Sequence, residues 1–302
     1  MLLSRLVRYI DAVSRHGSIR KASEALNIAP SAVNRQILEF EREIGMPIFD
    51  RLPRGMRLTS AGEVVVDHIR RMNRDVSMMN VRLNDLKGLQ SGKVRVVAAS
   101  GLMSSFISTI VSGFVRDHPK LDLKIDTLPL EAIIHEITEG YADLGLSFDL
   151  PRDPNIATLA SMHQPLGVIV PPDHPLAGRP ALRLSDCVSE MMILPPPGSG
   201  IRVLLDVAFA EARINPRIGV ESNSVALRKH LVREGAGITI LAAVDVIGDV
   251  ADGTVCHVPL ADPHVPGQTL KLVSRAKGTL EPLQAKLAEA FRRRFSELGA
   301  EV

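Results

Sequence analysis

The sequence predicts an α/β multidomain fold with an N-terminal helical head, one long linker helix and a C-terminal body of two α/β lobes. Three observations predict this fold. Two short amphipathic helices precede an arginine-rich turn, an apolar seam repeats from residue 65 to 86, and strand and helix segments alternate from residue 93 onward. We expect domain boundaries at 1–59, 60–89 and 93–302, with lobe I at about 93–162 and 267–302 and lobe II at about 163–266.

The head begins with two helices whose apolar residues recur at helical spacing. These residues are Ala22, Ala25 and Leu26 in the first helix, and Val33, Ile37, Phe40 and Ile44 in the second. Ser18 suits the N-cap of the first helix, Pro30 suits the first position of the second, and Gly45 suits its C-terminal stop. Residues 27–29 between them have about the length of a helix-turn-helix connection.

The outward face of the second helix carries polar side chains at its N-terminal end, the end that meets base edges in docked helix-turn-helix proteins. Asparagine can pair there with adenine, and arginine with guanine. Residues 49–58 read as a hairpin whose arginines can contact phosphates. The candidate DNA contacts are Ser18, Arg20, Pro30, Ser31, Asn34, Arg35, Arg51, Arg54 and Arg57. Each feature taken alone also fits an ordinary helix pair with a solvated basic loop.

A long helix is expected from residue 60, with Ser60 and Glu63 as a capping box. Its apolar residues repeat at alternating spacings of four and three: Val65, Ile69, Met72, Val76, Met79, Leu83 and Leu86. A seam this narrow favours packing against a second helix, most simply that of another copy of the chain, over the alternative of a core-facing helix in one domain. β-Branched residues at one heptad position favour two strands, which the generic rule makes parallel.

Charge is divided unevenly along the 302 residues. Residues 1–90 hold 15 Lys and Arg against 10 Asp and Glu, a balance of +5, and residues 91–302 hold 21 against 24, a balance of −3. A basic head suits an attraction to DNA that weakens as salt rises. No apolar stretch reaches the roughly 18 residues of a membrane helix, so we expect a cytoplasmic protein with no membrane partner. Cys187 and Cys256 stand far apart and suit ordinary thiols, with a redox disulfide as the alternative.

The body alternates strands and helices, which predicts parallel sheets covered on both faces. The expected strands are 93–99, 121–128, 142–148, 166–170, 191–194, 217–220 and 238–241. The expected helices are 103–115, 130–139, 201–212, 225–234 and 283–295. Ligands bind at the carboxyl edge of such sheets.

Three loops at these edges are rich in small polar residues: Ser100-Gly101, Gly198-Ser199-Gly200 and Ser222-Asn223-Ser224. If they converge, their hydroxyls and backbone N–H groups favour a small anion, with Arg202 as a counter-charge. Each loop alone also fits an ordinary helix cap. The chain lacks the motifs of a nucleophilic serine, a phosphate-binding loop, a dinucleotide site and a zinc protease, so we expect no catalytic residues, metal or cofactor.

The chain resembles the LysR-type transcriptional regulators in both parts. The head matches their Gly-Ser start at residues 17–18, their recognition helix at 33–37, their Gly-x-Pro-Leu-Phe-x-Arg step at 45–51 and their Leu-Thr-x-x-Gly close at 58–62. The body matches at Phe114–Pro119, Ala142-Asp143 and Leu231–Leu241. Pro30, Ser31 and Asn34 depart from the family pattern on the predicted DNA-facing surface, and Ala242 stands where many members have proline.

The resemblance implies a winged helix-turn-helix head, an antiparallel pair of linker helices and a two-lobed effector domain similar to the periplasmic solute-binding proteins. It also implies that the three polar loops are candidate effector contacts, and that residues at the facing sheet edges, Leu128, Pro129, Ser147 and Phe148, are further candidates. The full set of candidates is Ser100, Gly101, Leu128, Pro129, Ser147, Phe148, Gly198, Ser199, Arg202, Asn223 and Ser224.

These inferences predict a ligand-responsive transcriptional regulator that binds a promoter site of two-fold symmetry on double-stranded DNA. The other expected partners are a small effector, with an anion as the candidate, and further copies of the chain in a homodimer or homotetramer. RNA polymerase is a further candidate partner. An alternative function of a different class is a solute-binding protein whose basic head compacts DNA non-specifically. A third alternative is an enzyme whose active site lies in the two-lobed body.

Overall fold

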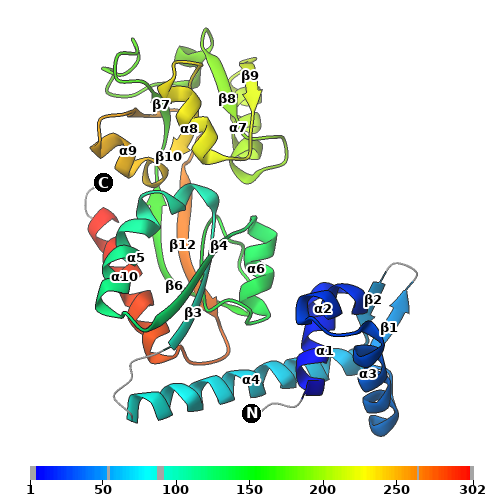
Figure 1. The fold of residues 1–302 in the computed structure, drawn as a ribbon. Coiled ribbons are helices and arrows are strands. Elements are labelled where there is room, and N and C mark those ends of the chain that lie inside the picture. Colours follow the sequence, from blue (N-terminus) through cyan, green and yellow to red (C-terminus); the bar gives the residue numbers. More distant parts are fainter. Residues whose placement is uncertain (1–4, 53–54, 87–91, 264, 300–302) are drawn as a thin grey trace. The chain divides into compact units, whose positions relative to one another are not determined.

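The computed structural model describes residues 5–52, 55–86, 92–263 and 265–299. The chain divides into two compact units, Met1–Ser91 and Gly92–Val302, called here the head unit and the body (Figure 1).

The head unit contains three short helices, α1 (Arg5–His16), α2 (Ile19–Leu26) and α3 (Pro30–Ile44). α2 and α3 form the predicted helix-turn-helix, and α1 is an additional helix beyond that pair. The predicted ends of α3 are confirmed, because Pro30 is its first residue and Gly45 follows it in the left-handed region at φ 75°. Ser18 occupies the N-cap position of α2, but its side chain makes no capping hydrogen bond.

The core of the head unit lies between these helices and includes Val33 and Ile37, both fully buried as expected. The prediction for Ala25 is wrong, since this residue is exposed. Ser23 is buried next to Ala22 instead, and its hydroxyl donates to the backbone oxygen of Arg20 at 2.7 Å. A small polar side chain can enter this core because that hydrogen bond satisfies it.

A two-stranded hairpin follows α3. β1 (Phe49–Leu52) pairs antiparallel with β2 (Gly55–Leu58), so that Asp50 lies opposite Arg57. The backbone N–H of Met56 donates to the oxygen of Gly17 at 2.8 Å, and a Cβ atom at Gly55 would overlap that same oxygen. This close approach fixes the hairpin to the turn between α1 and α2, and it requires glycine at position 55.

The linker helix α4 (Ser60–Leu86) is one continuous element of 27 residues. The capping box predicted for Ser60 and Glu63 is wrong. Thr59 provides the cap, because its Oγ1 accepts a hydrogen bond from the N–H of Gly62 at 3.0 Å and donates to the oxygen of Pro47 at 2.7 Å. The cap therefore also ties the start of α4 to the segment that precedes the hairpin.

The apolar seam of α4 divides into two parts. Ile69 is buried in the core of the head unit and Val65 packs against that core, so the prediction that the whole seam is free for a partner helix is wrong for these two residues. Met72 and Met79 keep 37% and 38% of their surface exposed, and Val76 is half-buried. The side chains of Leu83 and Leu86 lie outside the described residues.

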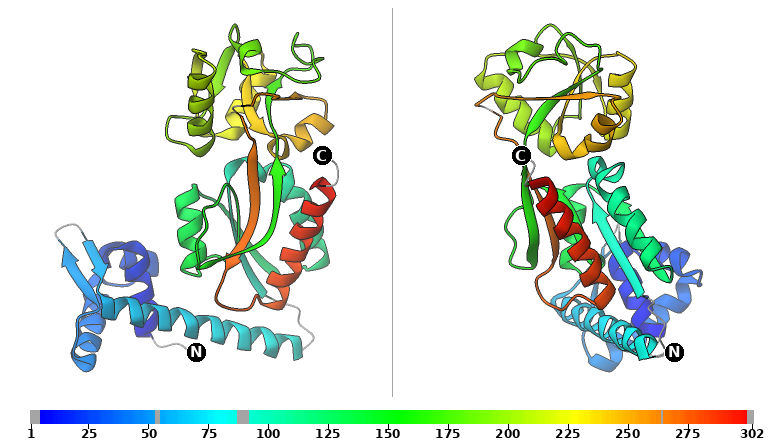
Figure 2. Two further views of the ribbon diagram at one scale, coloured as in Figure 1. Left: turned by 180° about the vertical axis from the view of Figure 1, so that it is seen from behind. Right: turned by 90° about the vertical axis from the view of Figure 1, so that its left-hand side faces the viewer.

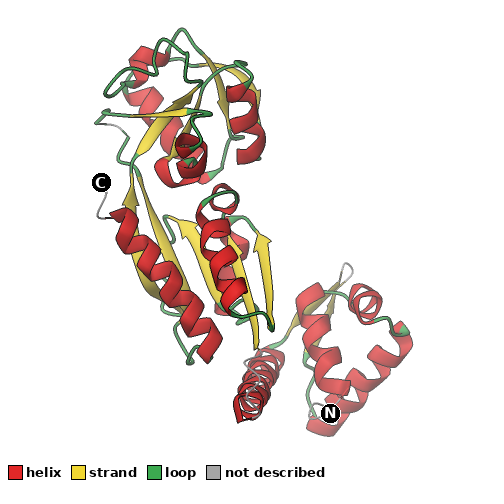
Figure 3. Cartoon of the chain, turned by 60° about the vertical axis from the view of Figure 1, so that its left-hand side comes forward, coloured by secondary structure: helices red, strands yellow, loops and turns green. Residues whose placement is uncertain are grey.

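The first lobe of the body is a five-stranded sheet in the order β4-β3-β5-β12-β6. Its strands are β3 (Gly92–Ala98), β4 (Leu121–Thr127), β5 (Leu144–Phe148), β6 (Ile156–Gln164) and β12 (Gln268–Arg275). α5 (Phe106–Asp117) and α10 (Pro282–Gly299) run side by side on one face, while α6 (Leu130–Thr138) covers the other (Figures 2 and 3).

The second lobe is built on β7 (Leu166–Val170), which pairs antiparallel with β10 (Thr239–Ala242) and β11 (Cys256–Pro259). β8 (Met191–Leu194) and β9 (Arg217–Glu221) form a separate parallel pair. The helices are α7 (Gly200–Glu211), α8 (Val225–Arg233) and α9 (Ile247–Ala251). The described part of the body also contains the 3₁₀ turns η1 (Ser100–Met103), η2 (Leu184–Cys187) and η3 (Ala243–Asp245).

The prediction of all-parallel sheets is wrong in part. β3 pairs parallel with β4 and β5, but β12 pairs antiparallel with β5 and β6. β6, β11 and β12 were not predicted from the sequence, and each adds an antiparallel pairing. The two predicted strands β7 and β10 also pair antiparallel with each other. Among the described residues, no helix has the length and apolar composition needed to cross a membrane.

Candidate functional site

α3 and the hairpin of β1 and β2 lie next to each other in the head unit, and together they carry several predicted DNA contacts (Figure 1). Pro30, Ser31 and Arg35 are exposed there, and Asn34 is half-buried. Arg51 on β1 reaches Asn34, since its Nη2 donates to Asn34 Oδ1 at 3.0 Å. This hydrogen bond brings together a helix residue and a hairpin residue 17 positions apart, which sequence spacing could not predict.

The other predicted DNA-contacting arginines of the head that the structure describes are paired with carboxylates. Arg57 pairs with Asp50 across the hairpin at 3.3 Å, and Arg35 lies 3.9 Å from Glu39 one turn along α3. Arg20 is exposed and pairs with Glu24 at 3.0 Å. Exposed pairs of this kind contribute about 1 kcal/mol or less, so each arginine can exchange its carboxylate for a phosphate. Arg54 lies outside the described residues.

The predicted effector contacts of the first lobe lie at the carboxyl edge of its parallel strands. Ala99 N donates to Leu146 O at 3.0 Å and Leu128 N donates to Ala98 O at 3.1 Å, which brings the ends of β3, β4 and β5 together. Ser100 and Gly101 begin η1, and Pro129 is the N-cap residue of α6. Ser147 is buried within β5 and Phe148 is half-buried at its end. The edge predicted from the sequence therefore exists in this lobe.

The predicted contacts of the second lobe also share one edge, because Ser222 N donates to Leu194 O at 2.9 Å. Gly198 adopts φ 84°, and Asn223 is exposed. Ser199 is the N-cap residue of α7, but its hydroxyl donates to Pro196 O at 3.0 Å instead of capping the helix. Ser224 caps α8 by accepting a hydrogen bond from Leu227 N at 3.2 Å. For Ser224 the ordinary capping interpretation thus accounts for the side chain.

The prediction that Arg202 supplies a counter-charge for a bound anion is wrong for this structure. Its buried guanidinium pairs with Asp206 at 2.7 Å and with Glu221 at 2.6 Å, and it also donates to Pro195 O at 2.9 Å. Glu221 and Asp206 raise the pKa of Arg202, and the hydrogen bond that Arg202 donates to Glu221 is the largest cause. The charge is neutralised within the lobe, so Arg202 anchors α7 to β9.

Different residues connect the two lobes. Lys229 on α8 donates to Ser104 Oγ, beside the start of α5, at 2.8 Å, and it pairs with Asp249 on α9 at 2.6 Å. Lys229 also donates to the backbone oxygen of Asp245 at 3.2 Å, and Arg233 is a second partner of Asp249. Lys229 and Asp249 are both buried. We call Ser104, Lys229, Asp245 and Asp249 the lobe-contact cluster.

Asp245 packs closely against the other lobe, and its pKa is shifted by burial. A Cβ atom at Gly101 would overlap its carboxylate, so glycine is required where η1 meets η3. Burial raises the pKa of Asp245 to about 6, although Arg228 and Lys229 lower it. Burial likewise lowers the pKa of Arg228 to about 10. Within the described residues, Oδ1 of Asp245 and Nε of Arg228 have no hydrogen-bond partner.

A sequence signal for the lobe-contact cluster lies in the residues of α8. Val225, Arg228, Lys229 and Val232 recur at the i, i+3, i+4, i+7 spacing of a buried helix face, and all four are buried in α8. Two adjacent cations on an apolar face require partners, because an unpaired buried charge is costly. Which carboxylates supply them depends on how the lobes pack.

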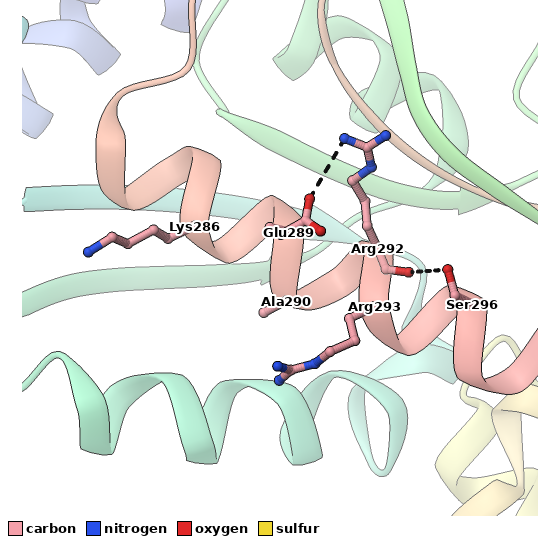
Figure 4. Close-up of a pocket in the computed structure, with 6 residues that line it drawn as sticks. All are labelled: Lys286, Glu289, Ala290, Arg292, Arg293 and Ser296. Atoms are coloured by element: carbon pink, nitrogen blue, oxygen red, sulfur yellow. Dashed lines mark hydrogen bonds and ion pairs between the residues drawn. The ribbon is translucent and has the colours of Figure 1, made fainter.

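A pocket also lies beside α10, and the residues that line it all belong to that helix (Figure 4). Its lining residues are Lys286, Glu289, Ala290, Arg292, Arg293 and Ser296. Glu289 lies 3.7 Å from Arg292, and Ser296 donates to the backbone oxygen of Arg292 at 3.2 Å. The charged side chains are mostly exposed and include an opposite-sign pair. None of the predicted functional residues lies in this pocket.

The described residues contain no group of three or more His, Cys, Asp or Glu side chains arranged to hold a metal ion. Both cysteines are free, Cys187 being buried and Cys256 half-buried. Burial, together with Asp186 and Glu190, raises the pKa of the Cys187 thiol to about 12. A thiol with so high a pKa is a poor nucleophile at neutral pH.

Comparison with known families matches both parts of the chain. Residues 4–63 match the family described as "Bacterial regulatory helix-turn-helix protein, lysR family", and residues 87–296 match the "LysR substrate binding domain". The RuBisCO operon transcriptional regulator of Allochromatium vinosum is 32% identical over 238 residues, covering 79% of this chain and 78% of that protein. The HTH-type transcriptional regulator CbbR of Xanthobacter flavus is 29% identical over 283 residues, covering 93% and 85%.

Solved structures show the same fold. A full-length OxyR variant from Pseudomonas aeruginosa superposes with a TM-score of 0.68 at 21% identity, covering 97% of this chain and 96% of that one. Full-length CbnR complexed with its target DNA gives a TM-score of 0.54 at 19% identity, covering 96% and 99%.

Proposed function

This chain belongs to the LysR family of transcriptional regulators, and we propose that its head reads a two-fold symmetric promoter site while a small effector bound between the lobes of its body controls that binding. A regulator of this kind acts by binding and not by catalysis. The single observation that carries the proposal is the N-terminal end of α3, where Ser31 and Arg35 are exposed and Asn34 contacts the hairpin arginine Arg51.

The geometry of the head supports major-groove recognition. The N-terminal residues of a recognition helix contact base edges, and a neighbouring hairpin contacts the backbone. Arg51 and Arg57 supply cations from β1 and β2, and the exposed Arg20 at the start of α2 supplies another. The CbnR relative whose structure was solved with its target DNA shares this fold. We propose the same mode of docking here.

Self-association is proposed to occur along the second half of α4. Met72 and Met79 are exposed and Val76 is half-buried, all at heptad spacing. In sequence the seam continues through Leu83 and Leu86. Burying these residues against the same helix of another copy removes apolar surface from water and places two heads on one DNA molecule. The dimer or tetramer so formed matches a DNA site of two-fold symmetry.

Effector binding is proposed at the edges that carry Ser100, Leu128 and Phe148 in one lobe and Gly198 and Asn223 in the other. A ligand that binds one arrangement of the lobes more tightly than another must shift the protein toward that arrangement. The lobe-contact cluster is the element such a ligand would strengthen or break. A cytoplasmic location and contact with RNA polymerase belong to the same proposal.

The test is a gel-shift titration of the full chain with the promoter region upstream of its own gene. We expect a sequence-selective complex whose affinity falls as salt rises from 50 to 200 mM, because phosphate contacts release counterions; a protein with 6–10 such contacts loses about 10³–10⁵ in affinity over this range. Asn34→Ala should relax preference at one or two base pairs. Equal loss on all sequences would instead support a DNA-compacting head, and the absence of any selective complex would refute the proposal.

A further inference from the structure

The hydrogen bond from Arg51 to Asn34 restricts which base Asn34 can read. Arg51 lies on β1 and Asn34 is the fifth residue of α3, so the hairpin reaches the base-reading end of the helix. The distance from Arg51 Nη2 to Asn34 Oδ1 is 3.0 Å. A guanidinium can only donate hydrogen bonds, so the atom of Asn34 that faces it must be the carbonyl oxygen. The orientation of the asparagine amide follows from chemistry.

With this orientation, Asn34 turns its Nδ2 amino group away from Arg51. The two free N–H bonds of that group remain available as donors. Arg51 also keeps most of its five N–H donors, because this hydrogen bond uses only one of them. In the described part of the chain Arg51 has no carboxylate partner, whereas Asp50 pairs with Arg57 at 3.3 Å. The Asn34–Arg51 pair therefore presents a surface of donors to any neighbouring base.

Base edges in the major groove differ in what they offer such a surface. Adenine presents the N7 acceptor beside the N6 amino donor, and the usual asparagine contact needs a free Oδ1 to accept from N6. Here a positively charged group already occupies the side of Oδ1. Guanine presents two adjacent acceptors, N7 and O6, and no donor. Two adjacent acceptors match the donors of the pair, and the amino group of adenine does not.

We infer that Asn34 and Arg51 act as one donor-only reading unit, so that this protein prefers guanine over adenine at the base pair beneath Asn34. The inference rests on the proposed function, since it requires α3 to dock in the major groove. It reverses the expectation from an isolated asparagine, which pairs with adenine. It also makes Arg51 a specificity-determining residue in addition to a phosphate contact.

The experiment is selection of binding sites by the full chain from a randomised double-stranded DNA library, followed by affinity measurement on single-base variants of the selected site. The position at which Asn34→Ala loses its preference identifies the base pair read by Asn34. At that position we expect the unaltered protein to favour guanine over adenine by about tenfold, within the range of one good side-chain–base contact. In Arg51→Ala, Oδ1 is released, and we expect the guanine-to-adenine ratio to fall by about tenfold.

Two further variants separate hydrogen bonding from charge. Arg51→Lys keeps the positive charge but lacks the planar fork, so its guanine preference should lie between those of the unaltered protein and Arg51→Ala. Arg57→Ala removes a hairpin arginine that does not contact Asn34, and it should weaken all sites about equally. Circular dichroism of each variant checks that the head remains folded.

The inference is overturned if the unaltered protein prefers adenine at this position. It is also overturned if Arg51→Ala weakens every site equally and leaves the guanine-to-adenine ratio unchanged within about twofold, a change well below that of one base contact. Failure of the proposed function has a different signature. In that case the unaltered protein selects no common sequence from the library at all.

Discussion

Replacement of Lys229 by methionine should destabilise the body. The Lys229 ammonium is buried and has three partners: Asp249 at 2.6 Å, Ser104 at 2.8 Å and the backbone oxygen of Asp245 at 3.2 Å. Lys229→Met keeps the length of the side chain and removes the charge. Breaking a buried ion pair from one side costs about 3–5 kcal/mol, because the other charge stays buried.

The magnitude should fall at the lower end of that range. Asp249 retains Arg233 as a partner, so we expect the free energy of unfolding to drop by about 3 kcal/mol. For a body of this size, such a loss lowers the melting temperature by about 6–12 °C. Burial and the nearby Arg233 lower the pKa of Lys229, so the charged pair is itself expensive to bury. Lys229→Met/Asp249→Leu should therefore recover most of the loss.

The assay must report on the body alone, because the two units can unfold separately. The chain has two tyrosines and no tryptophan. Tyr9 belongs to the head unit and Tyr141 to the body, so in a Tyr9→Phe background the fluorescence of Tyr141 follows the body during urea or thermal unfolding. Lys286→Met, at an exposed lysine of α10, is the matched control and should change stability by less than about 0.5 kcal/mol. A loss below about 1 kcal/mol in Lys229→Met, or a double variant no more stable than the single one, would refute the reasoning.

Three other predictions follow from named contacts. Burial raises the pKa of Asp245 from 3.8 to about 6. Between these pH values the unfolded state binds fewer protons than the folded state, so the free energy of unfolding should fall as pH rises from about 4 to 6. Asp245→Asn should remove up to about 3 kcal/mol of that fall, measured by urea titrations at a series of pH values. Thr59→Ala should destabilise the head unit by about 1 kcal/mol in thermal unfolding, whereas Ser60→Ala should be nearly neutral, and equal effects would contradict the assigned cap. In a thiol-labelling assay at pH 7.5, the native chain should label rapidly at Cys256 but not at the buried Cys187. This pH lies about 4.5 units below the Cys187 pKa of about 12, so little of that thiol is ionised. Labelling of both cysteines at one rate before unfolding would contradict the burial argument.

Local patterns determined much of the head unit. The spacing of Val33 and Ile37, the fixed φ of Pro30 and the glycine at position 45 predicted α3 to the residue, because each acts within its own helix. The proline and glycine within residues 49–58 likewise predicted the hairpin. The capping residue of α4 was misplaced by one position, since Thr59 is also held by Pro47, a contact that no local pattern reveals.

The body shows which features local sequence patterns do not predict, strand direction above all. The alternating strands and helices predicted an α/β body, and that architecture is present. Strand direction was only partly predicted, because β12 returns from the second lobe to pair with β5 and β6. Buried and half-buried residues alternate in the first part of β12, a pattern typical of a strand. The antiparallel pairing of β12, however, follows from the path of the chain between the lobes.

By itself, the sequence determined that this protein has a helix-turn-helix head, a linker helix with a heptad seam and an α/β body, because apolar periodicity and cap residues act over a few positions. Only the tertiary structure decided which charges meet. Arg202 is neutralised by Glu221, Lys229 pairs with Asp249 and joins the lobes through Ser104, and Arg51 holds Asn34 from 17 residues away. Long charged side chains reach partners set by packing between elements, and so the chemistry of the site depends on the fold in a way that spacing along the chain does not encode.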